Sequence, residues 1–241
     1  MFNNKTVAII GAMDCEIALL KEFLGDVKEY QNKNFITSVG KINNTKVIIA
    51  KSGVGKVAAA SCCQYLIDTF SPDYILNTGV AGGVAGGLNI SDIVVSTSFV
   101  QHDFDVTALG YAKGYVCNGV ESSKPTYFYS DKDLSDKIYE IAVEKFSKDK
   151  IHRGCIASGD MFVAKLDKKQ EIREMFDAMA AEMEGAAIAH CASLNGVPFV
   201  ALRAISDLAD GTKIENYPEF EIQTANVSAN LLQTILKTLS E

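Results

Sequence analysis

Residues 181–190 read AEMEGAAIAH, and residues 199–207 read FVALRAISD. The first run is predicted to be a helix of small residues that opens with carboxylates, because negative charge is favourable near the free N–H groups of a helix N-terminus. The second run is apolar like a buried strand, yet it carries Arg203 and ends in Asp207. Ligands of α/β proteins bind beyond the carboxyl ends of parallel strands. We therefore expect a site built from Glu184, Arg203 and Asp207.

The totals indicate one α/β domain spanning residues 1–241, since this length suffices for a single large core. Hydrophobic residues make up 48% and charged residues 22%, which is ordinary for a soluble enzyme. A net charge of −7 without a run of Lys and Arg argues against a nucleic-acid partner. No apolar stretch is long enough for a membrane span, and the early run at 7–12 is too short for a signal sequence. We expect a cytoplasmic protein with no membrane partner.

Cysteine and histidine spacing gives little support for a metal site. The six cysteines lack CxxC spacing and are interpreted as free thiols that serve as small apolar residues. His102, Asp103 and Asp105 form a cluster that could bind a metal, but one histidine with two nearby carboxylates is common in ordinary loops. The ordinary loop is the favoured interpretation.

The N-terminal part also directs carboxylates toward a site. Residues 6–10 are predicted to form a strand that stops at Gly11, and a helix follows that opens with Asp14 and Glu16. These two acids either belong to a site or only complement the helix terminus, and the spacing does not decide between the two. Residues 35–39 and 46–50 are expected to form an antiparallel pair.

Two glycine-rich stretches are candidate ligand loops. Gly53, Gly55 and Ala58 formally fit a dinucleotide fingerprint, but the strand before them is a hairpin partner and no acidic residue ends the next strand. Residues 77–83 are predicted to be a loop in which glycine lets the backbone approach a ligand, or simply a tight turn. The remaining strands are expected at 74–76, 90–96 and 154–157, the helices at 132–146, 165–175 and 224–239, and a loop at 208–220.

Seven segments, in this order, closely resemble the 5′-methylthioadenosine/S-adenosylhomocysteine nucleosidases of the purine nucleoside phosphorylase superfamily. They are IGAMxxE (10–16), KSGVGKVAA (51–59), NTGxAGG (77–83), HDxDVT (102–107), SGD (158–160), EME (182–184) and RAISD (203–207). The resemblance spans nearly the whole chain. It implies a three-layer α/β/α sandwich around a mixed, partly closed central sheet, assembled as a homodimer. It also implies hydrolysis of the N-glycosidic bond of adenine thionucleosides without a metal or organic cofactor.

The resemblance assigns roles residue by residue. Asp207 corresponds to the acid that protonates N7 of the departing adenine, and Glu16 to the group that activates water. The other positions correspond to substrate contacts: the adenine-stacking ring and a backbone contact to the base (Phe162, Val163), ribose contacts (Met183, Glu184), a neighbour of the water (Arg203), and further site-lining positions (Ser206, Val80, Gly82). Without the resemblance, Phe162 is better interpreted as a core residue.

Elementary chemistry supports these roles. Cleavage of a glycosidic bond develops oxocarbenium character, so carboxylates near the sugar stabilise the transition state. Adenine is a poor leaving group as an anion, so an acid at N7 is required. Asp207 must then hold a proton in the complex, although a free aspartic acid is ionised at neutral pH.

Two positions depart from the family pattern. Val80 stands where better-known members carry a serine that contacts the water, so water positioning is expected to depend more on Glu16 and Arg203. Leu109 stands where phenylalanine is expected, in the segment Leu109–Tyr111 that lines the thioalkyl pocket of the partner subunit in relatives. The preferred 5′ group therefore stays open among methylthio, homocysteinyl and other substituents.

Three rival functions are weighed against this one. A phosphorylase of the same fold needs basic groups for phosphate, whereas Asp14 and Glu16 offer carboxylates at the corresponding end. A nucleosidase acting on aminofutalosine could use the same residues. A nucleoside-binding sensor without turnover is expected to lack Glu16 or Asp207, and both are present.

Overall fold

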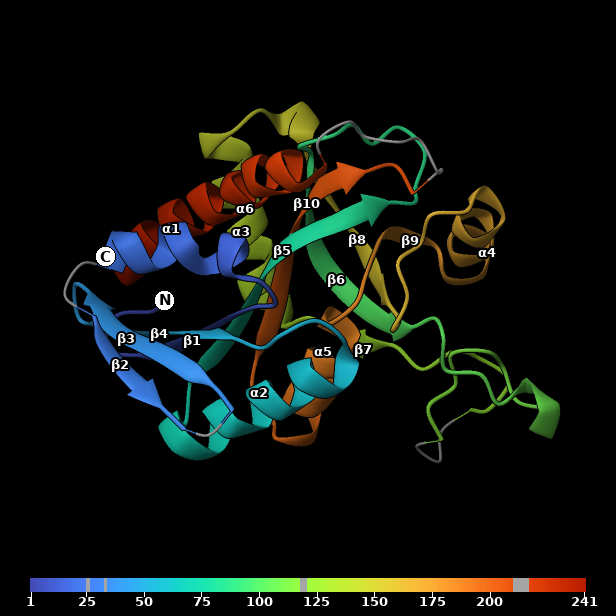
Figure 1. Cartoon of the computed structure of the whole chain (residues 1–241), viewed down its shortest axis with the longest axis horizontal. Helices are drawn as coiled ribbons and strands as arrows, with labels where there is room; N and C mark the ends of the chain where they lie inside the picture. The colour runs from blue at the N-terminus through green and yellow to red at the C-terminus, as the bar shows by residue number, and fades with distance from the viewer. Residues whose placement is uncertain (25–26, 33, 118–120, 210–216) are drawn as a thin grey trace.

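The computed structural model describes residues 1–24, 27–32, 34–117, 121–209 and 217–241. In these ranges the chain forms a mixed sheet of ten strands with helices on both faces (Figure 1). The strands are β1 Thr6–Gly11, β2 Lys28–Gln31, β3 Ile36–Ile42, β4 Thr45–Lys51, β5 Tyr74–Gly83, β6 Ile93–Gln101, β7 Phe128–Tyr129, β8 Ile151–Ser158, β9 Ala178–Glu182 and β10 Phe199–Asp207. The helices are α1 Asp14–Leu24, α2 Lys56–Phe70, α3 Lys132–Lys145, α4 Leu166–Phe176, α5 Gly185–Leu194 and α6 Tyr217–Ser240, with 3₁₀ turns at Thr107–Leu109 and Lys148–Lys150.

The sheet closes on itself over half of its width. The strand order is β10-β6-β8-β9-β5-β1-β4-β3-β2, and β10 also pairs in parallel with β5. Strands β5, β10, β6, β8 and β9 thereby form a closed ring, and β1, β4, β3 and β2 extend from β5 as an open sheet. The predicted mixed, partly closed sheet is confirmed.

Helices cover the two faces separately. Helices α1, α3 and α6 supply Leu20, Ile138 and Leu232 to one buried cluster, which also includes Ile9 of β1. Helices α2 and α5 pack on the other face, where Cys63 and Ile188 belong to a second cluster. This arrangement gives the predicted three layers (Figure 1). The two ends of the chain meet beside α6, where the Phe2 N–H donates to the Leu239 carbonyl at 2.6 Å.

Strand β10 lies at the centre of the molecule, as its sequence predicted. All nine of its residues are buried, between β5 on one side and β6 on the other. The apolar run therefore reflects burial on both faces. Its two charged residues, Arg203 and Asp207, lie toward the carboxyl end of the strand, where the site is found.

Three predicted elements differ from the structure in type or in where they begin, and the strand predicted at 90–96 runs instead from Ile93 to Gln101. The stretch 77–83 is not a loop but the second half of β5, because its backbone pairs with β10 and then with β9. Its polar members are satisfied inside the protein: the Asn77 side-chain amide donates to the Ile10 carbonyl at 2.8 Å, and the Thr78 and Ser228 hydroxyls lie 2.8 Å apart. Glycine at positions 82 and 83 allows this crowded pairing. The strand therefore delivers backbone N–H groups to the site.

The second difference lies in the stretch 181–190. Ala181 and Glu182 belong to strand β9, in which Ala181 pairs with Gly82, and helix α5 begins only at Gly185. The third difference is at the C-terminal helix, which begins at Tyr217 and not at 224, so Phe220 is helical. Residues 210–216 of the loop predicted at 208–220 lie outside the described residues. None of the described helices is long and apolar enough to cross a membrane.

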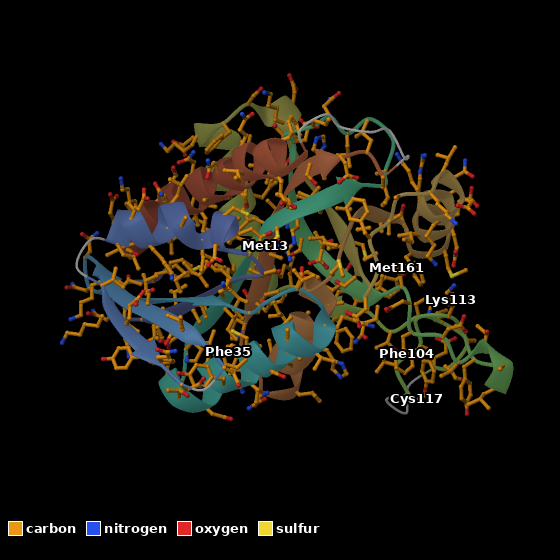
Figure 2. The ribbon with its side chains drawn as sticks, viewed as in Figure 1. Met13, Phe35, Phe104, Lys113, Cys117 and Met161 are labelled. Carbon is orange, nitrogen blue, oxygen red and sulfur yellow. The ribbon has the colours of Figure 1, made fainter. Side chains whose placement is uncertain are left out.

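A segment between β6 and β7 projects from the body of the molecule (Figure 1). It carries Phe104, Lys113 and Cys117, all of which lie away from the sheet in Figure 2. The side chain of Leu109 is 71% exposed, and that of Tyr111 is also exposed. Lys113 ties the segment to α4 through an ion pair with Glu171 at 2.5 Å.

Candidate active site

A cavity of about 210 Å³ opens at the carboxyl ends of β1, β5 and β10. Its lining residues come from distant parts of the chain and meet at one edge of the sheet. The lining residues are Ala12, Met13, Glu16, Val54, Val80, Ala81, Gly82, Phe162, Ala181, Glu182, Met183, Glu184, Ser206, Asp207 and Glu221. Met13, the residue before α1, lies near the centre of the molecule in Figure 2. The predicted residues Glu16, Val80, Gly82, Phe162, Met183, Glu184, Ser206 and Asp207 are all in this set.

Glu16 is held in place by three backbone N–H groups. Its Oε2 accepts from Ala12 at 2.6 Å and Met13 at 3.1 Å, and its Oε1 accepts from Val80 at 3.1 Å. Burial raises the pKa of this carboxyl, although Arg203 and the three N–H groups act in the opposite direction. The structure therefore resolves the alternative left open by the sequence, because Glu16 faces the cavity whereas Asp14 pairs with Lys51 outside it.

Gly79 lets a charged pair approach the backbone of β5. A Cβ atom at this position would lie 2.2 Å from Glu16 Oε1 and 2.3 Å from Arg203 Nη1. Both atoms therefore occupy the space that any other residue would fill. This close approach places the Arg203 guanidinium next to the carboxylate that faces the cavity.

Arg203 lies beneath the cavity and not on its surface. Its side chain is 1% exposed, and its Nη2 donates to Asn77 Oδ1 at 2.5 Å and to Glu182. Burial alone would lower the pKa of Arg203, but the surrounding charges of Glu182, Glu16 and Glu184 raise it. The guanidinium is thus a permanent cation among acidic side chains.

Glu182 is a site residue that the sequence prediction passed over. It accepts hydrogen bonds from the Ser158 hydroxyl, from Arg203, and from the N–H groups of Glu184 at 3.0 Å and Gly185 at 2.8 Å. Its carboxylate therefore satisfies the N-terminus of α5 and also fixes Arg203. The signal was present in the sequence, since an acid next to a predicted helix start is typical of this role.

Glu184 faces the cavity from the residue before α5. Its Oε1 accepts from the Gly55 N–H at 2.9 Å, and its Oε2 lies 3.7 Å from Arg203 Nη2. Burial raises the pKa of Glu184 to about 7, and the neighbouring charge of Glu182 adds to this effect. The bond from Gly55 shows that the glycine stretch 53–58 supports a carboxylate of the site, in place of the dinucleotide cradle considered from the sequence.

Asp207 ends β10 at the cavity. Its Oδ2 accepts from the Ser206 hydroxyl at 2.9 Å, and its Oδ1 accepts from the Ala209 N–H at 2.8 Å. A Cβ atom at position 82 would lie 3.0 Å from Asp207 Oδ1, so glycine there keeps room for the carboxyl. Asp207 also lines the cavity, where it can meet a ligand.

The two adjacent residues after β8 lie in different environments. Phe162 lines the cavity and its side chain is 63% exposed, so it is not the core residue that the sequence alone favoured. Val163 is buried in a cluster with Ile172 and Phe176 of α4 and is not among the lining residues. Of the two, Phe162 presents its side chain to a ligand.

Three lining residues were not predicted as site residues, although two of them lie in segments that the sequence analysis connected with a site. Val54 belongs to the glycine stretch before α2, Ala181 to β9, and Glu221 to the first turns of α6. Val54 and Ala181 are apolar and carry no chemical signal. Glu221 is one of many acidic residues in the chain, and only the fold brings it to this cavity.

The metal site that was considered but not favoured at His102, Asp103 and Asp105 is not assembled in the described part of the chain. Asp103 pairs with Lys56, and Asp105 accepts from the Thr107 hydroxyl at 2.6 Å. His102 is fully buried, and burial lowers its pKa to about 4. Among the described residues no group of three or more His, Cys, Asp or Glu side chains could hold a metal ion.

Comparison with known proteins gives the family. The sequence profile of the phosphorylase superfamily matches residues 6–241. A 5′-methylthioadenosine/S-adenosylhomocysteine nucleosidase of Actinobacillus succinogenes is 40% identical over 97% of this chain and 99% of its own length. The chain belongs to this nucleosidase family. The resemblance found in the sequence motifs is therefore confirmed.

Solved structures of relatives agree with this assignment. One such structure is the 5′-methylthioadenosine/S-adenosylhomocysteine nucleosidase of Neisseria meningitidis in complex with methylthio-immucillin-A. It superposes on this chain with a TM-score of 0.89 and 39% identity, covering 97% of this chain and 99% of the other. A futalosine hydrolase of Helicobacter pylori superposes with a TM-score of 0.90 at 31% identity, covering 97% and 98%. The phosphorylase-like fold is thus shared with nucleosidases that differ in the substrates they are named for.

Proposed function

We propose that this protein hydrolyses the N-glycosidic bond of 5′-methylthioadenosine and S-adenosylhomocysteine, releasing adenine and the 5-thioribose product. The observation that carries the proposal is that Glu16, Glu184 and Asp207 line one cavity together with the aromatic ring of Phe162. Carboxylates stabilise a sugar that develops positive charge, and an aromatic face suits a flat base. The names of the relatives supply the substrate class.

Glu16 is assigned the role of general base, which activates the attacking water. Water attacks C1′ while Glu16 accepts its proton, and the C1′–N9 bond breaks as the new C–O bond forms. The three N–H groups on Glu16 fix the carboxylate, and the adjacent Arg203 stabilises its ionised form. Because position 80 is valine, no side-chain hydroxyl there can contact the water, so Glu16 and Arg203 carry its positioning.

Asp207 is assigned the role of general acid, which protonates the departing adenine. It donates a proton to N7 of adenine as the bond to N9 breaks, so that the base leaves as a neutral molecule. The contacts from Ser206 and the Ala209 N–H leave the carboxyl aimed at the cavity. Gly82 keeps the backbone of β5 clear of it.

The remaining predicted residues are assigned to binding. Phe162 stacks on adenine and the backbone of Val163 contacts the base, while Glu184 accepts from the ribose hydroxyls beside Met183. A Glu184 carboxyl with a pKa of about 7 is a stronger proton acceptor than an ordinary glutamate, which suits a hydroxyl donor. Ser206 orients the acid and does not need to touch the substrate.

A phosphorylase reaction is disfavoured by charge. Phosphate binding calls for arginine or lysine. None of the residues lining the described cavity is basic, and Arg203 is buried behind Glu16 and Glu182. The carboxylates would repel phosphate, whereas they can accept a proton from water.

We further propose a cytoplasmic homodimer that serves methionine salvage. The segment Leu109–Tyr111 projects from the body and exposes apolar side chains, which suits a role near the partner's pocket. Leucine at 109 offers less area than the phenylalanine expected there. In this proposal the segment determines which 5′ substituent of the substrate is preferred. Leu109→Phe is therefore expected to change this preference.

The test is adenine release from 5′-methylthioadenosine in phosphate-free buffer, repeated with phosphate and with identification of the sugar product. Free methylthioribose at a phosphate-independent rate is expected. Strict phosphate dependence with a sugar 1-phosphate product would overturn the hydrolytic assignment. Activity only with aminofutalosine would move the protein to the other substrate class, and tight binding without cleavage of either nucleoside would indicate a sensor.

A further inference from the structure

Three polar residues outside the cavity form a closed ring of contacts. Lys56 Nζ lies 2.6 Å from Asp103 Oδ1, Asp103 Oδ2 accepts from the Asp160 N–H at 2.8 Å, and Asp160 Oδ1 accepts from the Lys56 N–H at 2.8 Å. Lys56 Nζ also donates to Gln101 Oε1 at 3.2 Å. We call Lys56, Asp103 and Asp160 the clamp.

The clamp lies beyond the buried cluster that packs α2 against β6 and β8, and it joins the start of α2 to the loops that follow these two strands. Lys56 is the first residue of α2, Asp103 follows the end of β6, and Asp160 follows the end of β8. The Lys56 and Asp103 side chains are 16% and 24% exposed. An ion pair this sheltered from water is worth more than an exposed one, and its hydrogen bonds are charge-assisted.

Each side of the clamp leads directly to a ligand-facing residue. Asp160 precedes Phe162 by two positions, and Phe162 lines the cavity with a largely exposed side chain. Lys56 follows Gly55, whose N–H holds Glu184. Met161, between Asp160 and Phe162, lies in Figure 2 on the side of the molecule that carries α4 and the projecting segment. The clamp therefore connects the segment that carries Phe162 with the residue next to Gly55, whose N–H holds Glu184.

Close packing around the clamp leaves its three residues little freedom to move. A Cβ atom at position 159 would lie 2.4 Å from His102 Nε2 and 3.1 Å from the Asp103 carboxyl carbon. A Cβ atom at position 55 would lie 3.1 Å from Asp160 Oδ1. Two glycines thus allow the three segments to approach, and the charged contacts then fix them.

We infer that Lys56 and Asp103 are positioning residues that hold the Phe162 segment in its ligand-binding place, although neither lines the cavity. The inference rests on the proposed function only for the identity of the base that Phe162 meets. If the phenyl ring of Phe162 is held loosely, it loses part of its stacking with the base. Stacking of one base on an aromatic side chain contributes roughly tenfold or more to affinity, so a loss of about this size is expected.

The test compares Lys56→Met with Lys5→Met as a matched control, because Lys5 forms an ion pair with Asp73 at 2.9 Å at the opposite end of β1. In Lys56→Met, the KM for 5′-methylthioadenosine and the Kd for adenine are expected to rise about tenfold, while kcat changes much less. Lys5→Met is expected to change neither constant. Lys56→Arg, which keeps the charge, is expected to recover most of the affinity.

A double variant separates positioning from general loosening of the fold. In a Phe162→Ala background the phenyl ring is absent, so adding Lys56→Met is expected to have little further effect on adenine affinity. A full additional tenfold loss in that background would overturn the inference, as would an unchanged KM in the single variant. Asp103→Asn repeats the test if Lys56→Met does not fold, since asparagine keeps an acceptor for the Asp160 N–H.

The two proposals fail in different ways. Wild-type protein that cleaves the nucleoside while Lys56→Met keeps its KM contradicts the clamp alone. Wild-type protein that binds adenine without cleaving any nucleoside contradicts the proposed function, and the adenine Kd still tests the clamp. Wild-type protein that does neither contradicts both.

Discussion

Arg203 and Glu182 form an ion pair in which both side chains are withdrawn from water, with exposed fractions of 1% and 3%. Two charges in such a place are stable only together, because each would otherwise be buried without compensation. Glu182 in turn accepts from the N–H groups of Glu184 and Gly185, so that the pair connects β10 to Glu184, which lines the cavity.

Glu182→Gln is expected to lower the free energy of unfolding by about 3 kcal/mol, since removal of one partner leaves the other as an uncompensated buried charge. Urea unfolding at neutral pH measures it. Glu174→Gln on the exposed face of α4 is the matched control and should unfold like wild type. Equal stability of the two variants would show that Arg203 is compensated by its other acidic neighbours.

Asp207→Asn is expected to lower kcat by about 10²–10⁴-fold while the fold and adenine binding are kept, because asparagine still accepts from the Ala209 N–H but cannot protonate N7. Steady-state kinetics and adenine titration measure the two properties. Ser206→Ala, which removes the hydrogen bond to Asp207 and a longer one to the Ala81 carbonyl but keeps the acid itself, is expected to lower kcat less. Near-normal turnover of Asp207→Asn would exclude this residue as the acid.

Gly79→Ala is expected to lower kcat by at least about 100-fold, because displacement of a catalytic group by an ångström has an effect of that size. The added Cβ would overlap with Glu16 Oε1 and Arg203 Nη1. Gly86→Ala is the control, since a Cβ there meets only Arg173 at 3.5 Å, an ordinary contact. Equal activity of the two variants would mean that Glu16 and Arg203 can separate without loss.

Glu184 makes stability depend on pH. Because burial raises its folded pKa to about 7 from an unfolded value of 4.5, the folded protein holds this proton more tightly across that interval. Its contribution to the free energy of unfolding is therefore full below pH 4.5 and lost as the pH rises through 7. Relative to wild type, Glu184→Gln is expected to be unchanged at about pH 4.5 and more stable at about pH 8, by on the order of 1–3 kcal/mol.

Thermal unfolding of both proteins at the two pH values measures this difference. The amide oxygen introduced by Glu184→Gln would still accept from the Gly55 N–H, so the comparison isolates the charge. The same variant is expected to bind the nucleoside more weakly, since the amide is a poorer acceptor for ribose hydroxyls. A pH-independent difference in stability would contradict the raised pKa.

Local patterns in the sequence determined much of the architecture. The alternation and apolar runs of β1, β3, β4 and β10 and the amphipathic spacing of α1 and α3 predicted these elements, because burial on one or two faces imposes a period on the residues themselves. The motifs identified the family and eight of the cavity-lining positions. Asp207 was visible as a polar group at the end of an apolar run.

The tertiary structure alone decided which backbone became strand and which acids met. Residues 77–83 are rich in glycine and were predicted as a loop, yet pairing with β10 and β9 makes them strand, since a ladder of hydrogen bonds outweighs a local preference. Asp14 and Glu16 are equivalent by spacing alone; the family motif points to Glu16, and the approach of β5 and Arg203 gives the physical reason. The sequence determined the elements and the chemistry available, whereas the closure of the sheet between β5 and β10 determined the site, because it brings together residues that lie more than a hundred positions apart.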